Sequence, residues 1–348
     1  MNKSMEKYWY RKPERVPLWA RVLSFFFQTK AVIRRILYIV FFFRVYKAKV
    51  PVIVVGNINV DGVGKTPVIA WLVQELKRRG YSPGIVGRGY GGQAEHWPQQ
   101  VRPDSDPLMV GDEAVLLARH CQCPMGVGPE RVAAIKQLTK HYNVDVIISD
   151  NGILHYAMGR DMEIAVIDGQ LRFGNGYCLP AGPLREPVGR IDNVDFRINN
   201  GGDVQAREYG MQISLLEMVN LKNPNKTMPI GELKGKRAHA IAGIGKPKRF
   251  FEQLIEQGIK VEEHPFEDHH PYQPGELDFG DKDIVLMTEK DAVKCERFAR
   301  DNYWYVRMKA DIDKDLGRDI LESLEKKSQP QGKIDGQQVT RHPGMPAV

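Results

Sequence analysis

Short β-branched runs alternate with longer amphipathic segments along the chain from about residue 50 onward. The short runs are typical of buried strands, and the longer segments carry apolar residues at helical spacing. This alternation predicts an α/β fold with a mostly parallel sheet flanked by helices. In the first half of the chain, the predicted strands are 50–55, 84–86, 124–127, 144–149 and 164–167, and the predicted helices are 66–79, 112–121 and 129–141.

The alternation stops between residues 170 and 205, where Gly, Pro, Arg and Asn are frequent, and it restarts further along. The interruption is typical of ordered loops around an active site or of a crossing between domains. We therefore expect a core domain over 50–205, a smaller α/β domain over 206–326 that closes a cleft, and a disordered polar tail over 327–348. The later predicted strands are 238–242, 260–264, 284–287 and 303–306, and the later helices are 247–257, 289–298 and 316–326.

The first 49 residues are both basic and apolar, and we expect them to form membrane-interacting helices. Residues 1–50 hold 12 Lys and Arg against 2 Glu, whereas the rest of the chain holds 38 basic and 41 acidic residues. A nucleic-acid enzyme would spread its basic residues over the catalytic body, so we expect an anionic membrane surface as the partner and no nucleic acid. Uncharged apolar runs such as 36–43 are shorter than the roughly 18–20 residues that span a bilayer.

These N-terminal helices are expected to lie in the membrane interface. Amphipathic aromatic side chains favour the headgroup region, so Trp9, Tyr10 and Trp19 are predicted to lie near the lipid headgroups, with arginines reaching phosphates. The alternative is that the helices pack on the domain that follows them.

A glycine-rich loop links the first predicted strand to the first predicted helix, as in P-loop nucleotide-binding proteins. Gly62 and Gly64 allow backbone N–H groups to converge on phosphate oxygens. Lys65 would bridge the β- and γ-phosphates, and the Thr66 hydroxyl would bind Mg²⁺. The loop departs from the general pattern at its first glycine position, which is an asparagine. The predicted nucleotide-binding residues are Asn59, Val60, Asp61, Gly62, Val63, Gly64, Lys65 and Thr66.

A second metal-binding group is expected at the end of a buried strand. Asp150 directly follows the apolar run 144–149 and could reach Mg²⁺ directly or through water. The alternative role for this carboxylate is a helix or turn cap. A guanine-reading motif would place a lysine one position earlier than it occurs in Thr288-Glu289-Lys290-Asp291, which argues against a GTPase.

Eight stretches of the chain together resemble the tetraacyldisaccharide 4'-kinases, the lipid A 4'-kinases of Gram-negative bacteria. They occur in the family's order and, with the N-terminal segment, cover the chain from about residue 10 to about residue 325. They are VGNINVDGVGKTP at 55–67, GRGYGG at 87–92, VGDE at 110–113, SDNGILHY at 149–156, RDMEIAVIDG at 160–169, RFGNGYCLPAGPLRE at 172–186, FEDHH at 266–270 and MTEKDAVK at 287–294.

This resemblance implies a P-loop kinase that uses ATP and Mg²⁺. The reaction would transfer the γ-phosphoryl group to the 4'-hydroxyl of tetraacyldisaccharide 1-phosphate and form lipid IVA. The enzyme would act as a peripheral protein at the cytoplasmic face of the bacterial inner membrane, and we expect it to be a monomer. One alternative is a P-loop kinase for another membrane glycolipid, and another is a membrane-associated nucleotide-switch ATPase with a protein partner.

The resemblance also suggests roles for individual residues. It implies that Asp112 accepts the acceptor's proton together with His269, and that Glu113 lies near the metal. From the sequence pattern alone, the two carboxylates could instead be a helix cap and a first-turn partner of the helix dipole. His269 could equally lie in a surface turn. The base–histidine pair favours chemistry over a switch.

Further basic residues are candidates for the substrate side of the site. Arg88 and Arg185 could bind phosphates or form structural salt bridges, and His155 could shape the acceptor pocket. Three positions depart from the family pattern, where aspartate, glutamine and glycine are usual. These departures, which bear on metal binding and rate, are Asn151, Leu154 and Asp61.

Overall fold

The computed structural model describes residues 7–10, 15–40, 42–60 and 62–328. Asp61 of the predicted phosphate loop lies outside the described residues, and so does the predicted tail beyond Ser328. The last described helix includes residues 327 and 328, so the first two positions of that predicted tail are helical.

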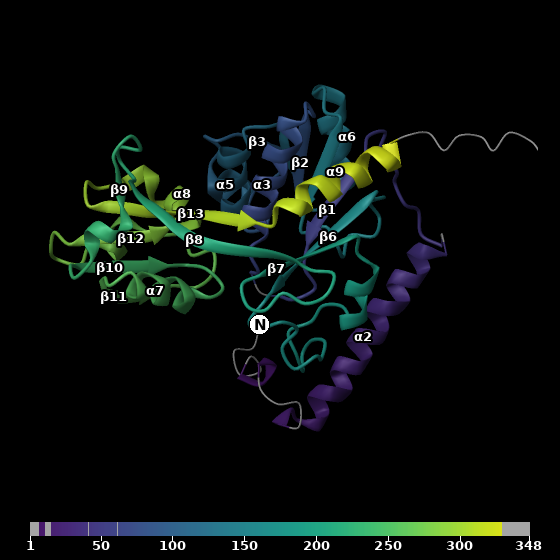
Figure 1. Ribbon diagram of the computed structural model, residues 1–348, viewed down its shortest axis with the longest axis horizontal. Helices are drawn as coiled ribbons and strands as arrows, with labels where there is room; N and C mark the ends of the chain where they lie inside the picture. The colour runs from purple at the N-terminus through teal and green to yellow at the C-terminus, as the bar shows by residue number, and fades with distance from the viewer. Residues whose placement is uncertain (1–6, 11–14, 41, 61, 329–348) are drawn as a thin grey trace, which may run out of the picture.

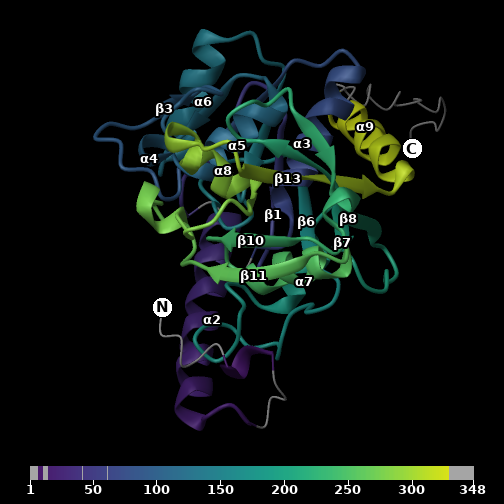
Figure 2. The ribbon, with the colours of Figure 1, turned by 90° about the vertical axis from the view of Figure 1, so that its left-hand side faces the viewer.

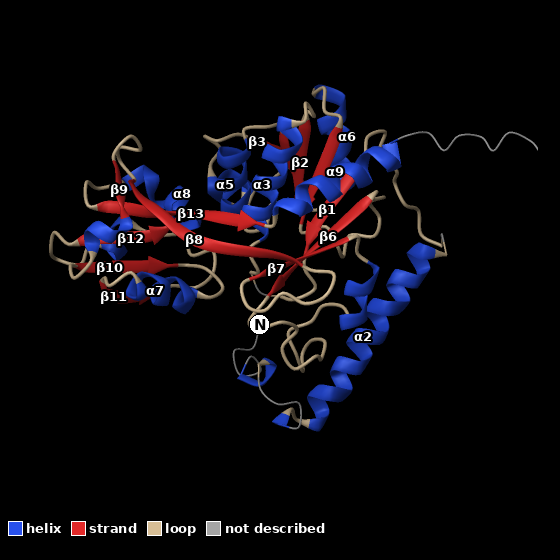
Figure 3. Ribbon diagram, in the orientation of Figure 1, coloured by secondary structure: helices blue, strands red, loops and turns tan. Residues whose placement is uncertain are grey.

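The described strands form one sheet of 13 strands. Figure 3 draws the strands in red. Their order is β11-β10-β12-β13-β8-β7-β6-β1-β5-β2-β4-β3, and β9 pairs with β8. The strands are β1 (Val52–Gly56), β2 (Pro83–Gly87), β3 (Gln99–Val101), β4 (Met125–Val127), β5 (Val146–Asp150), β6 (Met162–Asp168), β7 (Phe196–Asn200), β8 (Tyr209–Asn220), β9 (Thr227–Pro229), β10 (Arg237–Ala242), β11 (Lys260–Pro265), β12 (Ile284–Thr288) and β13 (Tyr303–Ile312).

The helices flank the sheet, which confirms the predicted α/β architecture (Figure 1). They are α2 (Leu18–Ile39), α3 (Lys65–Arg78), α4 (Pro107–Val110), α5 (Asp112–Cys121), α6 (Arg131–His141), α7 (Pro247–Glu256), α8 (Glu289–Cys295) and α9 (Lys314–Ser328), with short 3-10 helices η2 (Val188–Asn193), η3 (Ile230–Leu233), η4 (Pro274–Leu277) and η5 (Glu296–Phe298).

Two parallel blocks make up most of the sheet. One contains β7, β6, β1, β5, β2 and β4, and the other contains β11, β10, β12 and β13. The long strand β8 is parallel to β7 and antiparallel to β13, so it joins the two blocks into one sheet. Figure 1 shows β8 and β13 running between the two groups of strands. The carboxyl ends of strands from both blocks contribute residues to one cavity.

Four apolar clusters lie around the sheet of the described body, and a small fifth one, of Val16, Ala20 and Ala181, lies beside α2. One joins α3 and α5 to the first block, a second lies on that block's other face, and two more lie around β10 and β12. The last helix, α9, returns to the first block, where Leu316 and Ile320 join the cluster that contains Leu72. The final part of the segment 206–326 therefore contributes to the core of the first block. The division into two domains stays a prediction.

The helix α2 projects from the body, as Figure 2 shows. Only Ala20 and Ser24 are buried on it, and the Ser24 hydroxyl donates a 2.7 Å hydrogen bond to the Cys178 carbonyl. Among the described residues, no helix is long and apolar enough to cross a membrane. The large apolar side chains that α2 exposes are Leu18, Trp19, Val22, Leu23, Phe25, Phe26, Phe27, Ile33, Ile36 and Ile39.

The prediction that Trp9 lies near lipid headgroups is wrong. Its side chain is only 2% exposed, and its indole Nε1 donates a 3.0 Å hydrogen bond to the Pro180 carbonyl. Trp9 thus anchors the N-terminal segment to the loop before β7. Trp19, in contrast, is 56% exposed on α2.

Candidate active site

The phosphate loop leaves β1 and enters α3, the arrangement that its sequence predicts. Gly64 precedes α3 with a φ of 90°, in the left-handed region that favours glycine. A Cβ at this position would lie 2.7 Å from Asn200 Nδ2, which donates a 3.0 Å hydrogen bond to the Val63 carbonyl. The end of β7 therefore fixes the loop at the point where the chain turns into the helix.

The loop borders a cavity of about 970 Å³. Its lining residues from the loop are Val60, Gly62, Val63, Gly64 and Lys65. The ammonium of Lys65 donates a 3.2 Å hydrogen bond to Asn57 Oδ1, and burial lowers the pKa of Lys65 although Asp150 and Glu113 oppose this shift. A phosphate group beside this lysine would favour its charged form.

Two predicted loop residues lie beside the cavity rather than on its lining. Asn59 is buried, and its Nδ2 donates a 2.9 Å hydrogen bond to the Arg172 carbonyl, so its side chain anchors the loop to the segment after β6. Thr66 is half-buried in the first turn of α3. Their roles in nucleotide and metal binding stay predictions.

Asp112 and His269 meet across the two halves of the chain. The ring nitrogen Nδ1 of His269 lies 2.9 and 3.0 Å from the two carboxylate oxygens of Asp112. Asp112 begins α5 directly after Gly111, whose φ is 95° and where a Cβ would lie 2.4 Å from the Tyr90 carbonyl. The Tyr90 ring contacts the His269 ring with their centroids 4.9 Å apart. The pair that the resemblance implies is therefore formed.

The Asp112 carboxylate is held in its charged form. Burial alone would raise its pKa, but the hydrogen bond from His269 and the charges of Lys290 and Lys294 lower the pKa below its ordinary value. An ionised carboxylate only accepts hydrogen bonds, so His269 carries its proton on Nδ1 and presents the other nitrogen, Nε2, with a lone pair. His269 lines the cavity, whereas Asp112 lies behind it.

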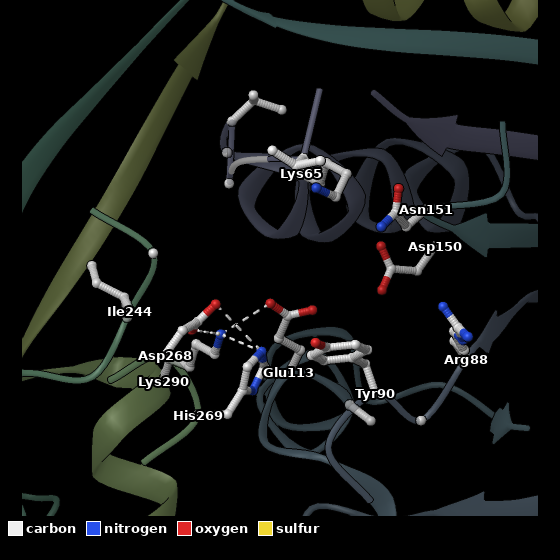
Figure 4. A pocket seen from close by; sticks show the side chains of 18 of the residues that line it. Lys65, Arg88, Tyr90, Glu113, Asp150, Asn151, Ile244, Asp268, His269 and Lys290 are labelled. Atoms are coloured by element: carbon white, nitrogen blue, oxygen red, sulfur yellow. Dashed lines mark hydrogen bonds and ion pairs between the residues drawn. The ribbon is translucent and has the colours of Figure 1, made fainter. Parts of the chain in front are cut away.

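Lys290 links the groups on this side of the cavity, as Figure 4 shows. Its ammonium lies 3.1 Å from Glu113 Oε1, 3.0 Å from Asp268 Oδ1 and 3.3 Å from His269 Nε2. Burial would lower the pKa of Lys290, but the charges of Glu113, Asp112 and Asp268 raise it above its ordinary value. This lysine keeps its positive charge beside the histidine.

Glu113 and Asp150 form an acidic pair in the cavity. Figure 4 shows both carboxylates beside the same open space, with Lys65 across from Glu113. Burial and the charge of Glu113 raise the pKa of Asp150 to about 6, although Lys65 and Arg131 oppose the shift. A divalent cation between the carboxylates would offset this repulsion, and hard oxygen ligands are those that Mg²⁺ prefers.

Basic groups line the opposite part of the cavity. Arg88 is exposed at the end of β2, and the Arg185 guanidinium donates 3.1 Å hydrogen bonds to both Asn57 oxygens. Burial and the charge of Arg88 lower the pKa of Arg185. Burial and nearby arginines, Arg131 first among them, lower the pKa of His155 to about 4, so that ring is neutral at pH 7.

These groups make the cavity suitable for a ligand that carries several phosphates. The buried His155 Nε2 has no hydrogen-bond partner among the described residues. Two of the residues that depart from the family pattern, Asn151 and Leu154, also line the cavity. Asn151 Oδ1 lies 3.4 Å from the Arg185 guanidinium.

Several cavity residues were not predicted from the sequence. Lys290 occurs in the family-like stretch 287–294, but its local sequence indicates only a possible guanine motif. Asn57, which accepts hydrogen bonds from both Lys65 and Arg185, lies two residues before the predicted loop and is only weakly indicated by the sequence. Strand ends and long-range packing place three further residues at the site, and no local sequence pattern indicates their positions. These residues are Tyr90, Asn200 and Arg131.

Comparison with known proteins finds one family along most of the chain. A family model described as tetraacyldisaccharide-1-P 4'-kinase matches residues 16–325. A tetraacyldisaccharide 4'-kinase from Nitrosococcus oceani is 48% identical over 320 residues, which cover 92% of this chain and 94% of that protein. One from Methylobacillus flagellatus is 48% identical over 321 residues, which cover 92% of this chain and 95% of that protein.

A solved structure has the same fold. A crystal structure of LpxK from Aquifex aeolicus in complex with ATP superimposes with a TM-score of 0.72 at 25% sequence identity. The match covers 87% of this chain and 97% of that one.

Proposed function

The chain belongs to the tetraacyldisaccharide-1-P 4'-kinase family, and we propose that it transfers the γ-phosphoryl group of ATP to the 4'-hydroxyl of tetraacyldisaccharide 1-phosphate. The product would be lipid IVA. The observation that carries this proposal is the Asp112–His269 pair, which meets beside the cavity that the phosphate loop lines.

The donor end of the cavity suits ATP. The loop N–H groups, the start of α3 and Lys65 supply positive potential for the β- and γ-phosphates. The complex of the Aquifex aeolicus protein with ATP supports this assignment. Lys65 would release Asn57 and bind the phosphates in its place.

The residues present also fit a Mg²⁺ ion. The ligands would be the Thr66 hydroxyl and the carboxylates of Glu113 and Asp150. Burial and the charge of Glu113 disfavour the charged form of Asp150, and a cation would offset both effects. When bound, the ion would neutralise charge on the phosphates and orient them.

His269 is the group placed best to take the proton from the acceptor hydroxyl. Its Nε2 carries a lone pair because its proton is on Nδ1, which donates a hydrogen bond to Asp112. Without ligands, the Lys290 ammonium donates a 3.3 Å hydrogen bond to that lone pair. Binding of the triphosphate would attract Lys290 and free Nε2. Asp112 then stabilises the positively charged ring that forms when Nε2 takes the proton.

The acceptor would enter from the side of the N-terminal helix. Arg34 of α2 lines the cavity and donates a 2.9 Å hydrogen bond to the Leu154 carbonyl. The exposed apolar side chains of α2 and its basic residues suit the acyl chains and anionic headgroups of a membrane surface. Arg88, Arg185 and His155 would contact the disaccharide phosphate and sugar. We propose a monomeric, peripheral enzyme at the cytoplasmic face of the inner membrane.

A transfer assay tests the function. Purified protein is incubated with Mg²⁺, ATP labelled on the γ-phosphate, and vesicles containing tetraacyldisaccharide 1-phosphate. We expect label in the lipid, loss of labelling in Lys65→Met, and unchanged labelling in the exposed control Lys140→Met. Labelling of a different glycolipid alone would support another kinase. ATP hydrolysis that never labels lipid and responds only to a protein partner would support a switch ATPase.

A further inference from the structure

A cluster of histidines and carboxylates lies at the outer end of the sheet, where β10 pairs with the edge strand β11 (Figure 2). The cluster comprises His239, Glu262 and His264, with Asp281 beside it. None of these residues lines the cavity that holds the phosphate loop. The proposed kinase chemistry therefore gives them no role.

The strand register brings the three side chains together. His239 on β10 pairs with Glu262 on β11, and His264 follows two residues later on the same face of β11. His239 Nδ1 lies 3.0 Å from His264 Nε2 and 3.8 Å from Glu262 Oε2. His264 Nε2 lies 3.9 Å from Glu262 Oε1. Two imidazole nitrogens and a carboxylate thus converge on one point.

Asp281 fixes which nitrogen of His239 can act as a ligand. Its carboxylate oxygens lie 3.1 and 3.3 Å from His239 Nε2. An ionised carboxylate only accepts hydrogen bonds, so the proton of His239 is on Nε2 and the lone pair is on Nδ1. A carboxylate behind a metal-binding histidine is a recurrent arrangement, because it orients the ring and raises its basicity.

The two imidazole rings are also held in place by an aromatic side chain. The Phe279 ring stacks on His239 at 4.2 Å and on His264 at 4.1 Å, with interplanar angles of 20° and 23°. His239 is buried, whereas His264 is 23% exposed and Glu262 is 48% exposed. An ion from solvent can therefore reach the cluster.

We propose that His239, Glu262 and His264 bind one divalent transition-metal ion of the Zn²⁺ type. Tetrahedral bonds of about 2.0–2.2 Å put neighbouring ligand atoms roughly 3.3–3.6 Å apart. The observed separations of 3.0, 3.8 and 3.9 Å lie on both sides of that range, so small side-chain movements close the site. Imidazole and carboxylate ligands suit Zn²⁺, and a water molecule completes four-coordination.

Arg237 is the group that opposes the ion. Its guanidinium lies 2.8 Å from Glu262 Oε2, and also 3.7 Å from Asp281 and 3.4 Å from Asp283. Glu262 Oε1 stays directed toward His264, so the carboxylate can bind the arginine with one oxygen and the metal with the other. The two aspartates offset the arginine's charge. The bound ion would fasten the edge strand β11 to β10.

Metal binding is measured directly with full-length protein that carries no histidine tag. Zn²⁺ competes with a chromophoric chelator, with millimolar Mg²⁺ present to occupy the acidic pair of the proposed kinase site. We expect one Zn²⁺ per chain, with His264→Gln and Glu262→Gln binding at least about tenfold more weakly. Asp281→Asn should weaken binding by roughly 10–100-fold. The exposed control His96→Gln should bind like the unchanged protein.

Thermal unfolding provides a second readout that does not depend on kinase activity. Zn²⁺ should raise the Tm of the unchanged protein and of His96→Gln but not that of His264→Gln, whose position on the edge strand β11 is partly exposed. The proposal is overturned if the unchanged protein binds Zn²⁺ no more tightly than roughly 100 μM. Equal affinity in the unchanged protein and His264→Gln would overturn it too.

Discussion

Replacing Asp112 with asparagine keeps the size of the side chain at position 112 but perturbs its partner His269, the proposed proton acceptor. The carboxylate now accepts hydrogen bonds from His269 Nδ1, at 2.9 Å, and from the Glu113 backbone N–H, at 2.7 Å. An asparagine amide that keeps its oxygen on the Glu113 N–H presents its NH₂ group to His269. The histidine then accepts that hydrogen bond at Nδ1 and carries its own proton on Nε2. The nitrogen that faces the cavity can no longer take a proton.

The expected loss follows from these contacts. A positioned base contributes about 10²–10⁴-fold, and each tenfold corresponds to roughly 1.36 kcal/mol of activation free energy. The change removes both the correct tautomer and the negative charge behind the ring, so we expect kcat to fall about 10³-fold, or roughly 4 kcal/mol. Asp112 is buried behind the cavity lining, so the KM for ATP should change by less than about threefold.

The assay measures initial rates of phosphoryl transfer to the lipid at saturating ATP. Asp104→Asn is the matched control, because that aspartate is exposed in the loop before α4. Thermal unfolding of each variant checks that the fold is intact. A folded Asp112→Asn protein whose kcat stays within about threefold of the unchanged enzyme would refute the reasoning.

Other changes separate the remaining parts of the account. Because Asp112 and His269 act as a unit, the double variant Asp112→Asn with His269→Gln should lose little more kcat than either single variant, and additive losses would argue against the pair. Lys290→Gln should lower kcat and shift the acid limb of the pH–rate profile to higher pH. The charge of Lys290 lowers the pKa of Asp112, so removing that charge raises the pKa. The control Lys282→Gln, at an exposed position, should leave the profile unchanged. Asp150→Asn should abolish transfer, yet it should stabilise the protein without ligands by on the order of 1–3 kcal/mol at pH 7. The pKa of Asp150 is raised from 3.8 to about 6 in the folded protein, so ionisation of this carboxyl lowers the free energy of unfolding as the pH rises from 3.8 to about 6. In thermal unfolding, the extra stability of Asp150→Asn should therefore disappear below pH 3.8. Phe25→Asp with Phe26→Asp should weaken vesicle binding at least about tenfold, because these side chains are 65% and 63% exposed on α2; Leu216→Asp, on the exposed face of β8, should bind vesicles normally.

Much of the fold could be predicted from local pattern. The strands β1, β5 and β6 are buried along almost their whole length, so their β-branched runs are unambiguous. The strand β8 was missed because most of its residues alternate between exposed and half-buried positions as it crosses between the two blocks. The polar composition of β7 is typical of a loop, but its buried residues Asn199 and Asn200 donate side-chain hydrogen bonds to backbone carbonyls rather than to water.

The site residues could be predicted from local sequence only where they lie within one short segment of the chain. The phosphate loop and Asp150 follow from strand-loop-helix context, because each depends on its own strand end. Asp112 and His269 are 157 residues apart, so only the family resemblance suggested their pairing. The position of Lys290 between Glu113 and His269 depends on how β12 and α8 pack against α5, which no periodicity encodes.

The position of the transferred phosphate tests the central claim most directly. The protein is incubated with Mg²⁺, ATP and either tetraacyldisaccharide 1-phosphate or its 4'-deoxy analogue, and the lipids are analysed by tandem mass spectrometry. We expect one added phosphate, located at the 4' position, and no phosphorylation of the analogue. Phosphorylation of the 4'-deoxy analogue, or a phosphate at any other position, would contradict it.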